Sequence, residues 1–351
     1  MNRHPFDGSL NQGFFSVFKE IYALKPEALQ HEIERTLALF RLRESQEEVY
    51  LVYDEKVRLA GIFPAQGEIA YFGFWDGVCD LSSHKKAFQF VSEEAAKRGY
   101  KTLLGPINFN TFHSYRIRLQ TPQAWTSFPG EPHNPDYYAD LLKDCGFTIS
   151  GRFNSHYISS EEVEKLYTRQ EHYLQSLEDI PFEKIPVNAA FWEARLPELF
   201  SLIQSIFSAN PNYHQVTFEE FCLDYGKAYG RMICPHTSVV FKDKSSGEWA
   251  AISLCLPNYH ELKGVQGPYS FEEHYPLLTR KTFLAKTVGV HPKFRNRHLM
   301  RYLAAYGMLR FPQFYEDAIF CLMRDDNISN SFTARHQKEI VNYALFRRSL
   351  R

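Results

Sequence analysis

The segment from Thr282 to Tyr306 constrains the fold of this chain more than any other. Residues 282–290 are rich in β-branched and aromatic side chains, which predicts a strand. Pro292 ends that strand because proline cannot donate to a strand ladder. From Leu299 the apolar residues recur with the spacing of one helix face. The segment therefore predicts a strand, a short turn and an amphipathic helix.

The turn of this segment is basic. Lys293, Arg295, Arg297 and His298 stand around the predicted helix start, where the first backbone N–H groups lack partners and the helix dipole is positive. A strand that leads into such a helix start is a common binding site for phosphate. The sequence therefore predicts an anion site at this turn.

At these residues the chain resembles the GNAT superfamily of CoA-dependent N-acyltransferases. The phosphate-binding pattern of that family is Val-x-Pro-x-x-(Arg/Gln)-x-x-Gly-x-(Gly/Ala). Val290, Pro292 and Arg295 match it, whereas His298 and Met300 stand where the pattern has two small residues. The resemblance implies acetyl-CoA or another acyl-CoA as cosubstrate. It implies these cofactor-binding residues: Val288, Val290, Arg295, Asn296, Arg297, His298, Leu299, Met300 and Asn327.

The chain passes twice through the same order of predicted helices and strands, which indicates a duplicated domain. Such alternation predicts a mixed sheet covered by helices. The order is similar to that of a GNAT domain. The implied fold class is α/β (α+β), with two tandem acyl-CoA N-acyltransferase-like domains, each a mixed, mostly antiparallel sheet flanked by helices. We expect an N-terminal domain at 1–158, a charged helical linker at 159–180 and a C-terminal domain at 181–351.

The N-terminal half resembles that of a group of uncharacterised bacterial GNAT-like proteins at residues 105–110, 134–138 and 145–147. On this resemblance Asn108, Asn110 and Tyr138 are candidates for a substrate pocket. The turn that corresponds to the basic turn carries Asp76 and Asp80, whose charge would repel phosphate. We therefore expect the CoA site in the C-terminal domain and not in the N-terminal one.

Three local features carry further expectations. Ser83 is expected to cap a helix over residues 83–98. Gly289 inside the predicted strand marks either a β-bulge or close packing against a helix. Predicted strands at 152–158 and 340–347 are expected to close the two halves.

GNAT-type transfer needs few specialised side chains, because the amine attacks the thioester directly. A base or a water relay removes the amine proton, and backbone N–H groups polarise the carbonyl. Family members often carry a tyrosine one or two turns after the position of Asn327, where Phe332 and Ala334 stand here. His336 could titrate in that region, although a surface histidine is the commoner case. The catalytic residues stay unknown at this point.

The composition excludes several classes of protein. The net charge of −1 provides no general attraction to nucleic acid or to anionic lipid. The six cysteines are scattered and no His-Glu-x-x-His pair occurs, so no metal is expected. No apolar run reaches the roughly 18 residues of a membrane span, and the N-terminus lacks the apolar core of a signal peptide. A cytoplasmic protein without a membrane partner is expected.

The resemblance to the GNAT superfamily implies an acyl-CoA-dependent N-acyltransferase that acts on a small-molecule or peptide amine. The sequence does not identify the acceptor or the oligomeric state. A non-catalytic binding or scaffold protein that kept a degenerate GNAT fold is an alternative. A Fem-type aminoacyltransferase, which takes its acyl group from charged tRNA, is a second; it predicts a strongly basic groove, and the net charge of −1 does not indicate one.

Overall fold

A computed structural model describes residues 1–350 except 124, 170–174, 176 and 266. The chain divides into two compact units, each discontinuous in sequence. Unit 1 comprises Met1–Thr121, Pro132–Arg152 and Asn342–Arg351, and unit 2 comprises Pro122–Glu131 and Phe153–Val341. The boundaries expected at residues 158 and 181 stay a prediction, and part of the expected linker lies outside the described residues.

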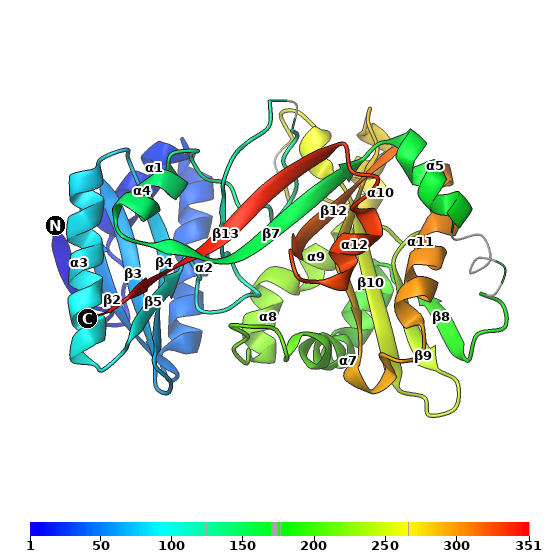
Figure 1. Cartoon of the computed structure of the whole chain (residues 1–351), viewed down its shortest axis with the longest axis horizontal. Helices are drawn as coiled ribbons and strands as arrows, with labels where there is room; N and C mark the ends of the chain where they lie inside the picture. The colour runs from blue at the N-terminus through cyan, green and yellow to red at the C-terminus, as the bar shows by residue number, and fades with distance from the viewer. Residues whose placement is uncertain (124, 170–174, 176, 266, 351) are drawn as a thin grey trace. The chain divides into compact units, whose positions relative to one another are not determined.

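Unit 1 is a mixed sheet with helices on both faces, α3 on one and α2 on the other (Figure 1). Its strands follow the order β1-β2-β3-β4-β5-β13, and the pair β4–β5 is parallel while the other pairs are antiparallel. Its elements are β1 Asn2–Pro5, α1 Ser16–Ile21, α2 Pro26–Arg43, β2 Glu47–Tyr53, β3 Val57–Pro64, β4 Ile69–Gly77, α3 Leu81–Lys97, β5 Thr102–Gly105, β6 Ile117–Arg118, α4 Tyr138–Asp144 and, from the C-terminal segment, most of β13 Glu339–Ser349.

Unit 2 repeats this sheet. Its strands follow the order β8-β9-β10-β11-β12-β7, with β11–β12 parallel and the other pairs antiparallel. Its elements are most of β7 Thr148–Ile158, α5 Ser160–Arg169, β8 Phe182–Pro186, α7 Ala189–Phe207, α8 Phe218–Tyr225, α9 Lys227–Met232, β9 Val239–Asp243, β10 Trp249–Pro257, α10 Phe271–His274, β11 Thr282–Val290, α11 Leu299–Phe314, β12 Asp317–Arg324 and α12 Ile328–Thr333.

The last strand of each sheet comes from the other half of the sequence. In unit 1, β13 pairs with β5 through Phe346 and Gly105 (Figure 1). In unit 2, β7 pairs with β12 through Ile158 and Ala318. The expectation that each of these strands closes its own half is therefore wrong. The repeated strand order confirms the predicted fold class, a mixed and mostly antiparallel sheet flanked by helices.

Local sequence explains where most elements begin. Pro26 stands in the first turn of α2, where its missing N–H is not needed. Asn188 accepts a hydrogen bond from the Phe191 N–H and caps α7. The helix α3 begins two residues earlier than expected, and its cap is Asp80 instead of Ser83, because the Ser83 N–H donates to the Asp80 carboxylate over 3.0 Å.

No helix in the described part of the chain is both long and apolar enough to cross a membrane.

Candidate functional site

In unit 2 the two parallel strands part midway along their length. β11 and β12 pair from Thr282 with Asp317 to Ala285 with Phe320, and both strands then continue without pairing to each other. We call the unpaired ends, residues 286–290 of β11 and 321–324 of β12, the splay. Strands that part in this way leave backbone groups available to a ligand.

A bulge lies at the start of the splay on each strand. On β11, Lys286 is the extra residue, because Leu254 pairs with Thr287 and Cys255 pairs with Ala285. On β12 the register shifts between Phe320 and Met323, and Leu322 has a φ of 56°. Its N–H donates to the Ser155 hydroxyl over 2.9 Å. Such bulges redirect a strand and are frequent beside active sites.

Gly289 does not form the bulge. A Cβ on Gly289 would lie 2.3 Å from Cγ2 of Ile206 in α7. The bulge alternative for this glycine is therefore wrong and the close-packing alternative is confirmed. The neighbouring Val288 and Val290 pack on the opposite side, in the cluster that contains Leu299 and Leu303 of α11.

The N-terminus of α11 is open. No side chain caps this helix, and its N-cap residue His298 has a φ of 60° and a ψ of 13°. Within the described residues, no partner is found for the backbone N–H groups of Asn296, His298, Leu299 and Met300. His298 thus carries, at the place of the first small residue of the GNAT pattern, the left-handed conformation that glycine adopts most easily.

The basic residues of the turn are not equivalent. Arg297 donates to the Asp243 carboxylate over 2.7 Å and lies over the ring of Phe182 at 4.5 Å. Lys293 is ion-paired with Glu248. Arg295 is exposed and donates one hydrogen bond, to the Ile206 carbonyl over 3.3 Å. Since a guanidinium has five N–H donors, Arg295 retains others for an anion.

The remaining predicted cofactor residues are divided between surface and core. Asn296 and His298 are exposed, Met300 has 38% of its surface exposed, and Leu299 is fully buried. Asn327 caps α12, because its side chain accepts from the Ser329 N–H over 3.2 Å. His336 is not the surface histidine expected; it is buried and its Nδ1 lies 2.9 Å from Oε2 of Glu162.

Unit 1 contains the same parting of strands, but a segment of the chain occupies it. β4 and β5 pair only as far as Tyr71 with Leu104. The Ile107 N–H then donates to the Phe72 carbonyl over 2.8 Å, and the Asn108 side chain accepts from the Phe74 N–H over 2.7 Å. The chain that follows β5 thus bonds to the backbone of β4 beyond the point where β4 and β5 stop pairing.

The start of α3, the corresponding helix of unit 1, is capped by a side chain of the protein itself. Asp80 caps α3, and hydrogen bonds from Lys56 and Ser83 lower the pKa of Asp80 to about 2. Asp76 is buried in an ion pair with Arg58 at 2.7 Å. Both acids therefore have structural roles.

The three candidates for a substrate pocket all lie in unit 1. The Asn108 side chain accepts the hydrogen bond from the Phe74 N–H of β4 that is described above. Asn110 is buried, and its side chain accepts from the Phe112 N–H over 2.8 Å. The Tyr138 hydroxyl donates to Asp76 over 3.3 Å and accepts from the Gly77 N–H over 3.0 Å. Their role in substrate binding stays a prediction.

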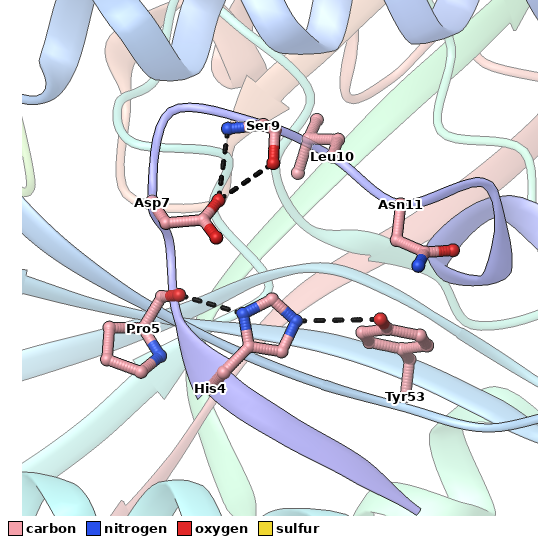
Figure 2. A pocket seen from close by; sticks show the side chains of 7 residues that line it. All are labelled: His4, Pro5, Asp7, Ser9, Leu10, Asn11 and Tyr53. Carbon is pink, nitrogen blue, oxygen red and sulfur yellow. Dashed lines mark hydrogen bonds between the residues drawn. The ribbon is translucent and has the colours of Figure 1, made fainter.

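A hollow of about 560 Å³ lies near the N-terminus of unit 1. Figure 2 shows that its polar side chains bond to one another. Ser9 donates to the Asp7 carboxylate through both its backbone N–H and its hydroxyl. The Tyr53 hydroxyl lies 3.5 Å from Nε2 of His4. None of the predicted site residues lines it. In the described residues no group of three His, Cys, Asp or Glu side chains could hold a metal ion.

Sequence reasoning missed two groups near the splay of unit 2. The Lys286 ammonium donates to the carbonyl of Pro129 over 2.8 Å, so Pro129 lies against the β11 bulge. Tyr229 on the short helix α9 places a buried hydroxyl next to Thr287. No signal in the sequence indicates either group, because both depend on contacts between distant segments.

Comparison with solved structures decides the fold. A tandem GNAT protein from the clavulanic acid biosynthesis pathway matches 100% of this chain and 98% of its own, with a TM-score of 0.53 and 10% identity. The chain has the fold of tandem GNAT proteins. A conserved protein of unknown function from Enterococcus faecalis V583 matches 100% of this chain and 73% of its own, with a TM-score of 0.51 and 9% identity.

At such identities the likeness to GNAT proteins establishes the fold alone. No family model matches the sequence. A comparison with curated proteins also gave no significant match.

Proposed function

We propose that unit 2 transfers an acyl group from an acyl-CoA thioester to an amine. One contrast between the units carries this proposal. In unit 2 the splay lies beside the uncapped start of α11. In unit 1 the chain after β5 bonds across the corresponding gap between β4 and β5, and Asp80 caps the corresponding helix α3. Among the described residues, the start of α11 in unit 2 keeps backbone N–H groups without a partner, whereas the corresponding helix start in unit 1 is capped.

The residues at α11 fit the phosphates of CoA. Four backbone N–H groups without a partner and the positive end of the helix dipole are available to an anion, as in other phosphate sites at helix starts. Arg295 adds an exposed guanidinium, which grips phosphate by charge-assisted hydrogen bonds. The bound thioester would lie along the splay, where the amine forms a C–N bond to the carbonyl carbon as the C–S bond breaks.

Binding of acetyl-CoA tests this function. We expect acetyl-CoA to raise the melting temperature of the wild type, because a ligand at 100 times its Kd stabilises the native state by about 2.7 kcal/mol. Arg295→Ala should weaken binding about ten- to one-hundredfold, since a hydrogen bond to a charged group contributes about 1.5–3 kcal/mol. Thermal shift and calorimetry with acetyl-CoA, longer acyl-CoAs and free CoA measure both effects.

Arg195→Ala serves as the matched control, because Arg195 is an exposed arginine of unit 2 whose charge is paired with Glu198. It should bind as the wild type does. If no acyl-CoA at millimolar concentration shifts the melting temperature of the wild type, the transferase proposal is wrong. The non-catalytic alternative, which His298 and the exposed Met300 favour, and the Fem-type alternative would then remain.

Glycine at position 298 should improve the site. Because a left-handed backbone is unfavourable for a residue with a Cβ, we expect His298→Gly to raise the free energy of unfolding by about 0.5–1 kcal/mol. The same change removes a side chain from the phosphate approach and should tighten acetyl-CoA binding. Urea denaturation and calorimetry measure the two effects. His298→Ala keeps a Cβ and should not gain stability; a glycine variant less stable than the wild type would contradict the argument.

A further inference from the structure

The hydroxyl of Tyr229 is buried without a hydrogen-bond partner. The residue has 9% of its surface exposed, and its oxygen has no partner among the described residues. Tyr259, also buried and also in unit 2, instead donates to the Met232 carbonyl over 2.9 Å. An unsatisfied buried hydroxyl costs about 1–3 kcal/mol. Groups of this kind are uncommon in folded proteins, and a catalytic role is one explanation for them; the hydroxyl of Tyr315 is another such group in unit 2.

Tyr229 lies at the splay. Although burial raises the pKa of Tyr229, the side chain of Thr287 in β11 is near enough to lower it as a weak hydrogen-bond donor. The hydroxyl has no other partner among the described residues. Cys255 of β10 and Cys321 of β12 also lie within electrostatic range of it. Thr287 and Cys321 are among the first residues beyond the point where β11 and β12 stop pairing. The hydroxyl therefore stands where the two strands part.

The ring of Tyr229 is held firmly in this place. It packs against Trp192 with 5.5 Å between ring centroids and against Tyr225 with 5.0 Å. Trp192 is itself fixed, since its indole N–H donates to the Tyr225 carbonyl over 3.0 Å. A Cβ on Gly230 would lie 2.5 Å from Cδ1 of Trp192, so only glycine permits this close packing. The hydroxyl is thus preorganised before any ligand arrives.

We infer that the Tyr229 hydroxyl donates a hydrogen bond to the carbonyl oxygen of the acyl thioester bound at the splay. This inference rests on the proposed function. It concerns the short helix α9 between β8 and β9, whereas the resemblance pointed to the helix after β12.

The hydroxyl acts as a donor and not as a base. Burial raises the pKa of Tyr229 above its usual value, so the group keeps its proton at neutral pH. As the amine nitrogen bonds to the carbonyl carbon, negative charge grows on the carbonyl oxygen and strengthens the hydrogen bond. The amine nitrogen loses one proton to water, the carbonyl then reforms, and the C–S bond breaks with its electron pair leaving on sulfur as the thiolate of CoA. Tyr229 transfers no proton in these steps.

A comparison of two ligands tests the inference without knowledge of the acceptor. Acetyl-CoA has the thioester carbonyl and free CoA lacks it. We expect Tyr229→Phe to weaken acetyl-CoA binding about five- to tenfold, as a neutral hydrogen bond contributes about 0.5–1.5 kcal/mol, and to leave the Kd of CoA unchanged. Calorimetry gives both constants. The carbonyl stretch of ¹³C-labelled acetyl-CoA should also lie at lower frequency on the wild type than on Tyr229→Phe.

Ligand-free stability separates this role from a structural one. Since its hydroxyl has no partner, Tyr229→Phe should melt at or above the wild-type temperature. The matched control Tyr259→Phe removes a bonded hydroxyl and should melt lower, with the ratio of the two Kd values unchanged.

The outcomes distinguish the inference from the proposed function. If the wild type binds neither ligand, the proposed function fails and the inference fails with it. If the wild type binds both ligands and Tyr229→Phe leaves the ratio of their Kd values unchanged, the inference alone is wrong. A loss of ligand-free stability in Tyr229→Phe equal to that in Tyr259→Phe would also overturn it.

Discussion

Removal of residues 342–351 is expected to unfold unit 1 while unit 2 stays folded. These residues supply the strand next to β5, and Tyr343, Ala344 and Phe346 in it are fully buried. Each large buried side chain contributes about 1.5–3 kcal/mol, so the loss of several matches the whole stability of an ordinary domain, about 5–15 kcal/mol. Arg348 adds hydrogen bonds to the carbonyls of Cys145 and Phe88 at 2.8 and 2.9 Å.

Hydrogen exchange of the chain that ends at Val341 measures this effect. Amides of β2, β3 and β5 should lose protection, and those of β9, β10 and β11 should keep it. A synthetic peptide of residues 339–351 should restore protection in unit 1. Deletion of Met1–Pro5 is the control, because β1 is a largely exposed edge strand that pairs with β2 alone in the described sheet. Equal loss of protection in both units would contradict the prediction.

Asp76→Ala is expected to destabilise unit 1 by about 3–5 kcal/mol. The Asp76 carboxylate accepts from Arg58 Nε over 2.8 Å and from the hydroxyls of Tyr22 and Tyr138 over 2.9 and 3.3 Å. The side chains of Arg58 and Asp76 are only 4% and 8% exposed. Without the carboxylate, a buried guanidinium would remain without its counterion, which is far costlier than the loss of a surface ion pair.

Urea denaturation of Asp76→Ala, of Asp76→Asn and of the double variant Arg58→Met/Asp76→Ala tests this reason. Asparagine keeps hydrogen-bond acceptors and should cost less than alanine. The double variant removes the unpaired charge and fills the space with an apolar side chain, so it should be more stable than Asp76→Ala alone. A double variant less stable than Asp76→Ala would show that the buried charge is not the cause.

The parts of the fold that local chemistry decides could be predicted from the sequence. The bounds of β11 and the start of α11 at Leu299 follow from side-chain pattern and from Pro292, and the structure confirms them. The cap of α3 was missed because Asp80 and Ser83 both suit that position, and the choice depends on where the helix begins.

The parts that depend on distant contacts could not be predicted. The β11 bulge at Lys286 follows from the register with β10, while Gly289 makes close contact with α7. Both outcomes were compatible with a lone glycine in a strand. The exchange of β7 and β13 has no local sign, because either strand suits either sheet by pattern.

In the candidate site, too, local features could be predicted from the sequence and contacts between distant residues could not. The basic turn marked the helix start correctly, but only the structure shows that Arg297 is engaged by Asp243 while Arg295 is exposed. It also shows that His298 has the backbone conformation of a glycine. Tyr229 could not be found from sequence, because an absent hydrogen bond depends on every neighbour of the hydroxyl.

The exchange of last strands has a consequence for synthesis on the ribosome. Chains generally fold their N-terminal domain first as it emerges. Here the segments of unit 2 are complete once Val341 has been made, whereas the sheet of unit 1 lacks the strand beside β5 until residues 342–349 follow. The nascent chain should therefore fold in the reverse order, and the first residues translated should be the last to become protected from proteases and from aggregation.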